Sequence, residues 1–205
     1  MSNLSTQTRF EKARRIFSQV GGVMRTREAI RLGIHPRTLY AMRDEGDLER
    51  LSRGLYRLAE MPPLGNPDLA TVALRVPKGV ICLISALAFH DLTTQIPHYI
   101  YLALLRGAEA PRMEYPPLRL FWFSPEPFAE GIETHQMDSA PVRVYSAEKT
   151  LADCFKYRNK IGLDVAIEAI QLYFERKSIK VDKLMHYADV CRVRKVMRPY
   201  VEALL

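Results

Sequence analysis

Residues 21–58 read GGVMRTREAIRLGIHPRTLYAMRDEGDLERLSRGLYRL, and this stretch decides the expected fold of the N-terminal part of the chain. Just before it, apolar residues recur at helical spacing from Phe10 to Val20 and predict a first helix, which Gly21-Gly22 would end. Inside it, Thr26 is a good N-cap for a short helix over 27–32, with Gly33 closing that helix. The sequence therefore predicts two helices before a tight turn over 33–35.

A third helix and a hairpin follow this turn. Pro36 favours a helix start, and the helix is expected to run to about residue 45 and to end at Gly46. Two short strands, over 48–51 and 55–58, then flank Ser52-Arg53-Gly54, where glycine can supply a positive φ. This order of elements is typical of a winged helix-turn-helix, which we predict over residues 1–60.

The rest of the chain is expected to be a linker over 61–67, rich in proline, and a mixed α+β domain over 68–205 with a helical C-terminal end. The whole protein is therefore predicted to be of the α+β class. The expected helices are 68–76, 86–92 after Ser85, a helix to about residue 157 capped by Ser146, and 163–174, 181–188 and 192–204. The expected strands are 98–105, 118–123 and 142–145.

Charge is concentrated in the predicted head. The chain carries a net charge of +7, and residues 1–60 hold 12 Lys/Arg against 7 Asp/Glu. Such an excess favours an anionic partner. The sequence has no apolar run long enough for a membrane span and no signal-peptide pattern at its start, so we expect a cytoplasmic protein that does not enter a membrane.

Metal and cofactor sites are not expected. Cys82, Cys154 and Cys191 lie far apart in apolar surroundings, without the spacing of a zinc site or the even number typical of a disulfide framework. The five histidines show no HxxxH or HExxH spacing.

The third helix provides the first candidate residues for DNA contacts. With Leu39 and Met42 facing inward, its first turns present Arg37, Tyr40, Ala41 and Asp44 outward, and Thr38 on the flank. Arginine can donate two hydrogen bonds to guanine, threonine and alanine can contact a thymine methyl, and tyrosine can reach a phosphate or a base edge. The alternative is that these are ordinary solvated side chains.

Further candidates surround this helix. Arg25 and Thr26 precede the second helix, whose start attracts phosphate, although a plain N-cap would also explain Thr26. Arginines alternate with leucines on the hairpin and are expected to meet the DNA backbone or minor groove, or else to protect an exposed strand edge. The full predicted DNA-binding set is Arg25, Thr26, Arg27, Arg37, Thr38, Tyr40, Ala41, Arg50, Arg53 and Arg57.

The second predicted domain shows no catalytic motif, and no enzyme activity is predicted. Glu148, Lys149 and Asp153 are interpreted as helix-start charges and surface ion pairs. Glu175-Arg176-Lys177 resembles the ExK ending of metal nucleases but lies at a predicted helix end. Basic residues gather in the C-terminal part, where they either extend a nucleic-acid surface or keep the helices solvated: Arg176, Lys177, Lys180, Lys183, Arg192, Arg194, Lys195 and Arg198.

Residues 21–58 together with SAEKTLADCFKYRNKIGLDVAIEAI (residues 146–170) resemble the AbiEi family of antitoxins from type IV, abortive-infection toxin–antitoxin systems. The resemblance implies a repressor that binds inverted repeats in the promoter of its own operon. It also implies a C-terminal domain that counters a nucleotidyltransferase toxin without a stable complex. Its DNA-reading positions fall on Arg25, Thr26, Arg37, Thr38 and Tyr40, with wing contacts near Arg53.

Three functions remain open from the sequence. The first is a promoter-binding repressor and antitoxin, with two copies binding cooperatively to paired half-sites. The second is a nucleic-acid-processing enzyme, a nuclease or nucleotidyltransferase, that uses the winged head for docking and Glu148, Asp153 or Glu175 for chemistry. The third is a winged head that binds a protein.

Overall fold

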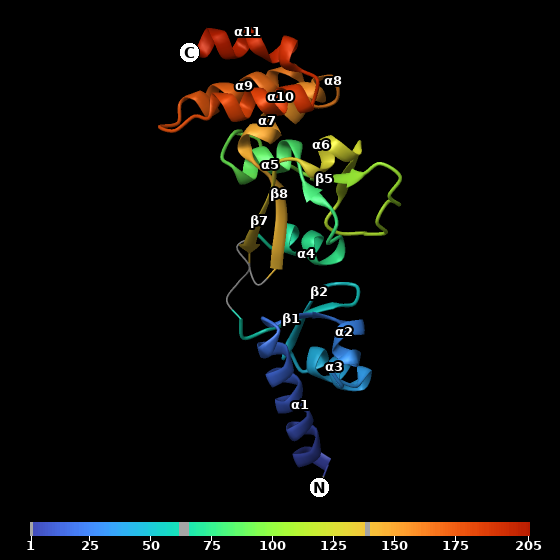
Figure 1. The fold of residues 1–205 in the computed structure, drawn as a ribbon. Coiled ribbons are helices and arrows are strands. Elements are labelled where there is room, and N and C mark those ends of the chain that lie inside the picture. Colours follow the sequence, from blue (N-terminus) through green and yellow to red (C-terminus); the bar gives the residue numbers. More distant parts are fainter. Residues whose placement is uncertain (1, 62–65, 138–139) are drawn as a thin grey trace. The chain divides into compact units, whose positions relative to one another are not determined.

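The computed structural model describes residues 2–61, 66–137 and 140–205 of the chain (Figure 1). Contacts between Cα atoms divide it into two compact units. The first holds the described residues within 1–71 and 136–140, and the second holds 72–135 and those within 141–205. Of the predicted linker, residues 62–65 lie outside the described residues.

The first unit combines helices with a small antiparallel sheet. Helix α1 (Ser2–Gln19) is followed by strand β1 (Val23–Arg25), helices α2 (Thr26–Arg31) and α3 (Pro36–Asp44), and the hairpin of β2 (Leu48–Ser52) and β3 (Leu55–Leu58). The strand order is β1-β3-β2, so β3 lies in the centre. The predicted helices and hairpin strands are confirmed, but β1 was not predicted, because three residues are too short to show a periodic pattern.

The core of this unit explains why α1 packs where it does. Phe10 and Phe17 are buried on one face of α1, against Leu39 and Met42 of α3. Burying side chains of this size contributes about 1.5–3 kcal/mol each. The prediction that Val20 extends this inner face is wrong: α1 ends at Gln19, the next glycines have positive φ, and Val20 is 39% exposed.

The second unit alternates helices and strands and then becomes fully helical. Three elements cross the division between the units: α4 (Pro67–Arg75), β7 (Ile132–Met137) and β8 (Ala140–Tyr145). The other described elements of the second unit are β4 (Val80–Ile81), α5 (Leu83–Phe89), β5 (Ile100–Leu105), β6 (Leu118–Phe123), α6 (Pro125–Ala129), α7 (Ala147–Lys156), α8 (Arg158–Ile161), α9 (Leu163–Phe174), α10 (Val181–Val190) and α11 (Arg194–Leu204).

A mixed sheet and a helical layer share the core of this unit. The strand order is β6-β5-β4-β8-β7, with β5 parallel to β6 and β4 parallel to β8. Helix α7 contacts α5, α9, α10 and α11, and in Figure 1 the orange-to-red C-terminal helices lie side by side. The α+β class and the helical C-terminal end are confirmed.

Two expectations for the second unit were wrong or incomplete. Ser85 does not cap a helix: α5 begins earlier, after Cys82, and the buried Ser85 hydroxyl instead donates to the carbonyl of Tyr99 (3.2 Å) and accepts from the amide of Tyr101 (2.9 Å). The sequence also missed β4, α6, β7 and the short helix α8. Strand β4 has only two residues, and four of the six residues of β7 are polar, so neither shows clear alternation.

Candidate nucleic-acid interface

Helix α3 is held by its inner face and by a cap at its start. Leu39 and Met42 are fully buried. His35 is the N-cap residue, and its Nδ1 accepts a hydrogen bond from the backbone N–H of Arg37 at 3.2 Å. Pro36 occupies the first turn, as predicted. The helix therefore begins at a defined residue, which fixes the direction of its outer side chains.

The outer face of α3 carries most of the predicted candidates. Arg37 and Tyr40 are exposed, with Tyr40 at 44%. Thr38 and Ala41 are half-buried, and Ala41 packs against the core of the first unit. A base could therefore reach Arg37 and Tyr40 directly, whereas Ala41 offers only part of its surface.

Arg43 is a neighbour of this face that the sequence did not single out. Its guanidinium donates to the Asp44 carboxylate, at 2.8 Å from Nε and 2.6 Å from Nη2, and its carbon lies 5.5 Å from the centre of the Tyr40 ring. The hydrogen bond to Asp44 raises the pKa of Arg43. Asp44 is thus paired, and its charge is offset at the end of the helix.

The start of α2 differs from the prediction. Arg25 is the N-cap residue, without a side-chain cap, and Thr26 is the first helical residue, so the predicted Thr26 cap is wrong. The cause is β1: Arg25 pairs with Leu55 of β3 and stays extended, so the helix follows directly after the strand. The Thr26 amide donates to the Gly54 carbonyl at 2.9 Å. This amide is used within the protein and is not available to a phosphate.

The same bond joins the hairpin tip to α2. Gly54 has a φ of +73°, and a Cβ there would lie 3.5 Å from the Thr26 hydroxyl oxygen. Arg53 precedes it at the tip and is exposed, and Arg50 is exposed on β2. Arg27 is exposed on the first turn of α2. The tip is therefore anchored by its backbone while it presents arginine to the solvent.

Arg57 was predicted to face DNA, and the structure contradicts this. The residue is 5% exposed; Nη2 donates to the carbonyl of Met61 at 2.5 Å, and Nη1 lies 3.4 Å from the Glu49 carboxylate. The reason is again β1. Because β1 covers the other side of β3, Arg57 lies opposite both Val23 and Glu49 on a central strand rather than on an open edge.

The second unit buries charges that the sequence analysis placed on the surface. Lys149 and Asp153 of α7 are 0% and 1% exposed and form an ion pair at 2.6 Å. The Lys149 ammonium lies 4.2 Å from the centre of the Tyr145 ring, and the Cys191 thiol donates to Asp153 at 3.2 Å. Burial raises the pKa of Asp153, and Lys149 opposes that shift. The interpretation as surface pairs is wrong because α7 lies at the centre of the helical layer.

Glu148 joins several elements of the same unit. Its carboxylate accepts from the Tyr173 hydroxyl of α9 at 3.0 Å and lies 3.1 Å from the Lys183 ammonium of α10. Lys183 also lies 3.9 Å from Glu133 of β7. Burial alone would raise the pKa of Glu148, but its own backbone amide, Lys183 and Tyr173 together hold the pKa below its ordinary value.

Two of the three carboxylates considered for catalysis are engaged by other protein groups. Glu148 and Asp153 are each occupied by protein partners, and Glu175 is the C-cap of α9. Among the described residues, no cluster of His, Cys, Asp or Glu is arranged to hold a metal ion. Burial also raises the pKa of the Cys82 and Cys154 thiols, which disfavours their reactive thiolate form.

Part of the predicted C-terminal basic surface is engaged by other groups of the protein. Arg194 pairs with Asp189 at 2.5 Å and Arg198 with Glu202 at 2.6 Å. Arg176 donates to the carbonyl of His90, and Lys183 is held by Glu148. Other cations on this part of the chain lie at or near the surface beside these paired residues: Lys177, Lys180, Arg192 and Lys195.

Comparison with known families bears on the first unit. A family model described as "Transcriptional regulator, AbiEi antitoxin" matches residues 11–59. The resemblance seen in the sequence is thus confirmed for the stretch from within α1 to just past β3. This family consists of DNA-binding transcriptional regulators that act as antitoxins. No curated protein matches the chain.

In the described part of the chain, no helix is both long enough and apolar enough to cross a membrane.

Proposed function

We propose that residues 1–60 form a winged helix-turn-helix that reads duplex DNA, with α3 as the recognition helix and the β2–β3 hairpin as the wing. The observation that carries the proposal is the outer face of α3. It presents exposed Arg37 and Tyr40 from a helix whose inner face is fully buried. A helix fixed in this way can enter the major groove, where Arg37 would contact guanine N7 and O6.

The surrounding residues fit distinct roles in such a complex. Arg53 at the anchored tip and Arg50 on β2 would contact the backbone or the minor groove. Arg27 on α2 would neutralise a phosphate, while the half-buried Arg25, Thr26, Thr38 and Ala41 would line the contact. Arg57 is left out of this interface because its guanidinium is already used inside the sheet.

We further propose that the protein represses its own operon through inverted repeats, with two copies binding cooperatively. In this proposal residues 68–205 form the effector domain, which counters a nucleotidyltransferase-type toxin without forming a stable complex with it. The family match over 11–59 supports an antitoxin transcriptional regulator as the general function. An enzyme of nucleic acids would instead need carboxylates free to act, whereas Glu148 and Asp153 are engaged by protein groups.

The test is binding of the purified chain to its own upstream DNA and to a scrambled duplex, at several salt concentrations, with Arg37→Ala beside the wild type. We expect preference for the upstream DNA and a reduction of that preference by about 1–3 kcal/mol in Arg37→Ala. Equal and weak binding to both duplexes would overturn the proposal. Turnover of either duplex, abolished by Glu148→Gln or Asp153→Asn, would favour the enzyme instead.

A further inference from the structure

We propose that α1 and the start of α3 together form a phosphate site, which binds a phosphate of the DNA backbone beside the recognition helix. This inference rests on the DNA-reading function proposed above and adds residues to it. The phosphate site is a depression of about 140 Å³ between α1 and the turn that leads into α3. Arg9 and Lys12 line it from α1, and Gly33, His35 and Thr38 line it from the turn and α3.

The position of the cations on α1 follows from helical spacing. Arg9, Lys12, Ala13 and Ile16 recur at i, i+3, i+4 and i+7, so they share one flank of the helix. The aliphatic residues of that flank pack toward the core, and the two cations, both exposed, lie at its rim. Their charges therefore face the side on which α3 begins.

The other lining groups suit an anion as well. His35 Nδ1 accepts the Arg37 amide, so the neutral ring carries its proton on Nε2 and can donate there. Thr38 adds a hydroxyl, which can also donate. Among the described residues, those that line the depression include no carboxylate. Donors and positive charge without a competing acid are what a phosphate needs.

The backbone at the turn is open to a ligand. Gly33 has a φ of +87°, and a Cβ built there would meet nothing within 4 Å. The sugar-phosphate backbone of DNA can therefore approach the turn without displacing protein atoms. In helix-turn-helix complexes the first residues of the recognition helix contact base edges in the major groove. The phosphates that border this groove therefore pass close to the turn before the recognition helix.

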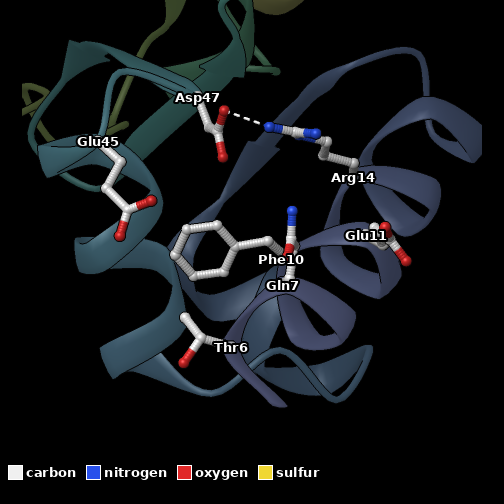
Figure 2. A pocket seen from close by; sticks show the side chains of 7 residues that line it. All are labelled: Thr6, Gln7, Phe10, Glu11, Arg14, Glu45 and Asp47. Atoms are coloured by element: carbon white, nitrogen blue, oxygen red, sulfur yellow. Dashed lines mark hydrogen bonds and ion pairs between the residues drawn. The ribbon is translucent and has the colours of Figure 1, made fainter. Parts of the chain in front are cut away.

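The opposite flank of α1 borders a groove with several carboxylates, and this determines on which side of α1 a duplex would bind. A groove of about 350 Å³ there is lined by Glu11, Glu45 and Asp47, together with Phe10, Arg14, Thr6 and Gln7 (Figure 2). Arg14 pairs with Asp47, and that hydrogen bond raises the pKa of Arg14. Two further carboxylates in this groove would repel phosphate. A duplex on the N-terminal side of α3 is thus attracted by one flank of α1 and repelled by the other.

The test replaces both cations, as Arg9→Gln/Lys12→Gln, in the full-length protein. We expect the slope of log K against log salt to become shallower by about 0.9 for each phosphate that the variant no longer neutralises, on upstream and scrambled duplexes alike. The preference for upstream DNA should stay unchanged, because phosphate contacts carry no sequence information. Arg15→Gln is the matched control: it removes the same kind of charge from α1 at an exposed position outside the depression.

Two results would overturn the inference. One is a slope in the double variant equal to that of the wild type. The other is a change in slope per removed charge in Arg15→Gln that equals the change in the double variant, which would indicate diffuse electrostatic attraction rather than a phosphate site. Thermal denaturation of all variants, whose melting temperatures are expected to coincide, excludes unfolding as the cause.

If Arg37→Ala abolishes the preference for upstream DNA while the double variant keeps the full salt slope, only this inference fails. If the wild type shows no preference for upstream DNA, the proposed function fails, and the salt slope on scrambled DNA still tests the phosphate site.

Discussion

Gly131 occupies a position where the second unit has no room for a side chain. Its φ is +74°, and a Cβ there would lie 2.6 Å from the Cβ of Lys149. Its carbonyl accepts the Ser146 amide at 2.7 Å, so the backbone cannot simply move away from α7. This close approach lets the chain pass directly over the buried lysine.

Gly131→Ala should therefore destabilise the protein more than Gly107→Ala. Gly107 has a φ of +91°, but a Cβ there meets nothing within 4 Å, so the control carries the backbone strain without the steric clash. We expect the two variants to differ in unfolding free energy by about 1–3 kcal/mol, as for overpacking. Urea denaturation of the two variants measures it. Equal destabilisation would show that φ alone, and not contact with Lys149, requires glycine at 131.

Single residues also show how far the sequence determined the candidate site. Arg37 and Tyr40 were predicted to face outward because the apolar spacing of Leu39 and Met42 orients the helix, and they do. Arg57 was misplaced because its burial depends on a strand more than thirty residues away in the sequence. Helical spacing is a local signal, whereas strand pairing is not.

At the scale of elements, we expect the hairpin to separate DNA binding from stability. Arg53 is exposed at the tip and Arg57 is buried between β1 and β2, although both were predicted to meet DNA. Arg53→Ala should weaken DNA binding and make its salt dependence shallower, by about 0.9 in slope if Arg53 neutralises one phosphate. Its melting temperature should match that of the wild type, because an exposed side chain is replaced.

Arg57→Ala should behave in the opposite way. It removes the hydrogen bond to the Met61 carbonyl and the ion pair with Glu49, so we expect the unfolding free energy to fall by about 1–3 kcal/mol. Its DNA affinity, measured at a temperature where the variant is folded, should stay close to that of the wild type. A stable Arg57→Ala protein with weakened DNA binding would reverse these roles and restore the prediction made from the sequence.

Elements were predictable where one signal dominated. The strand over 118–123 and the helix over 163–174 were placed with their observed bounds, because each has a long apolar pattern. Ser146 was identified correctly as a cap, and its hydroxyl accepts the Lys149 amide. The two- and three-residue strands β4 and β1 carry no pattern of their own and form because neighbouring strands offer hydrogen bonds.

At the scale of the whole molecule, charge is handled differently in the two units. In the first, exposed arginines lie on α3 and the hairpin. In the second, Lys149 and Asp153 neutralise each other inside the core, and Glu148 connects α7, α9 and α10 through Tyr173 and Lys183. The sequence could not reveal this, because a charged residue on a predicted helix is usually exposed.

The Glu148 network should make stability depend on pH. The folded protein holds the pKa of Glu148 below its ordinary value, so the unfolded chain binds this proton more readily. Stability from Glu148 is thus complete above the ordinary glutamate pKa and is lost as the pH falls through that value toward the lower folded pKa. We expect the unfolding free energy of the wild type to fall more steeply between about pH 5 and pH 3 than that of Glu148→Gln.

Asp153 has the opposite shift, but it is present in both proteins and its effect cancels in the comparison. Glu126→Gln, which removes an exposed carboxylate of α6, is the matched control and should follow the wild-type curve. Urea denaturation at half-unit pH steps provides the measurement. Parallel curves for wild type and Glu148→Gln would mean that Lys183 and Tyr173 do not stabilise the ionised carboxylate. The contacts of Glu148 would then serve packing rather than charge.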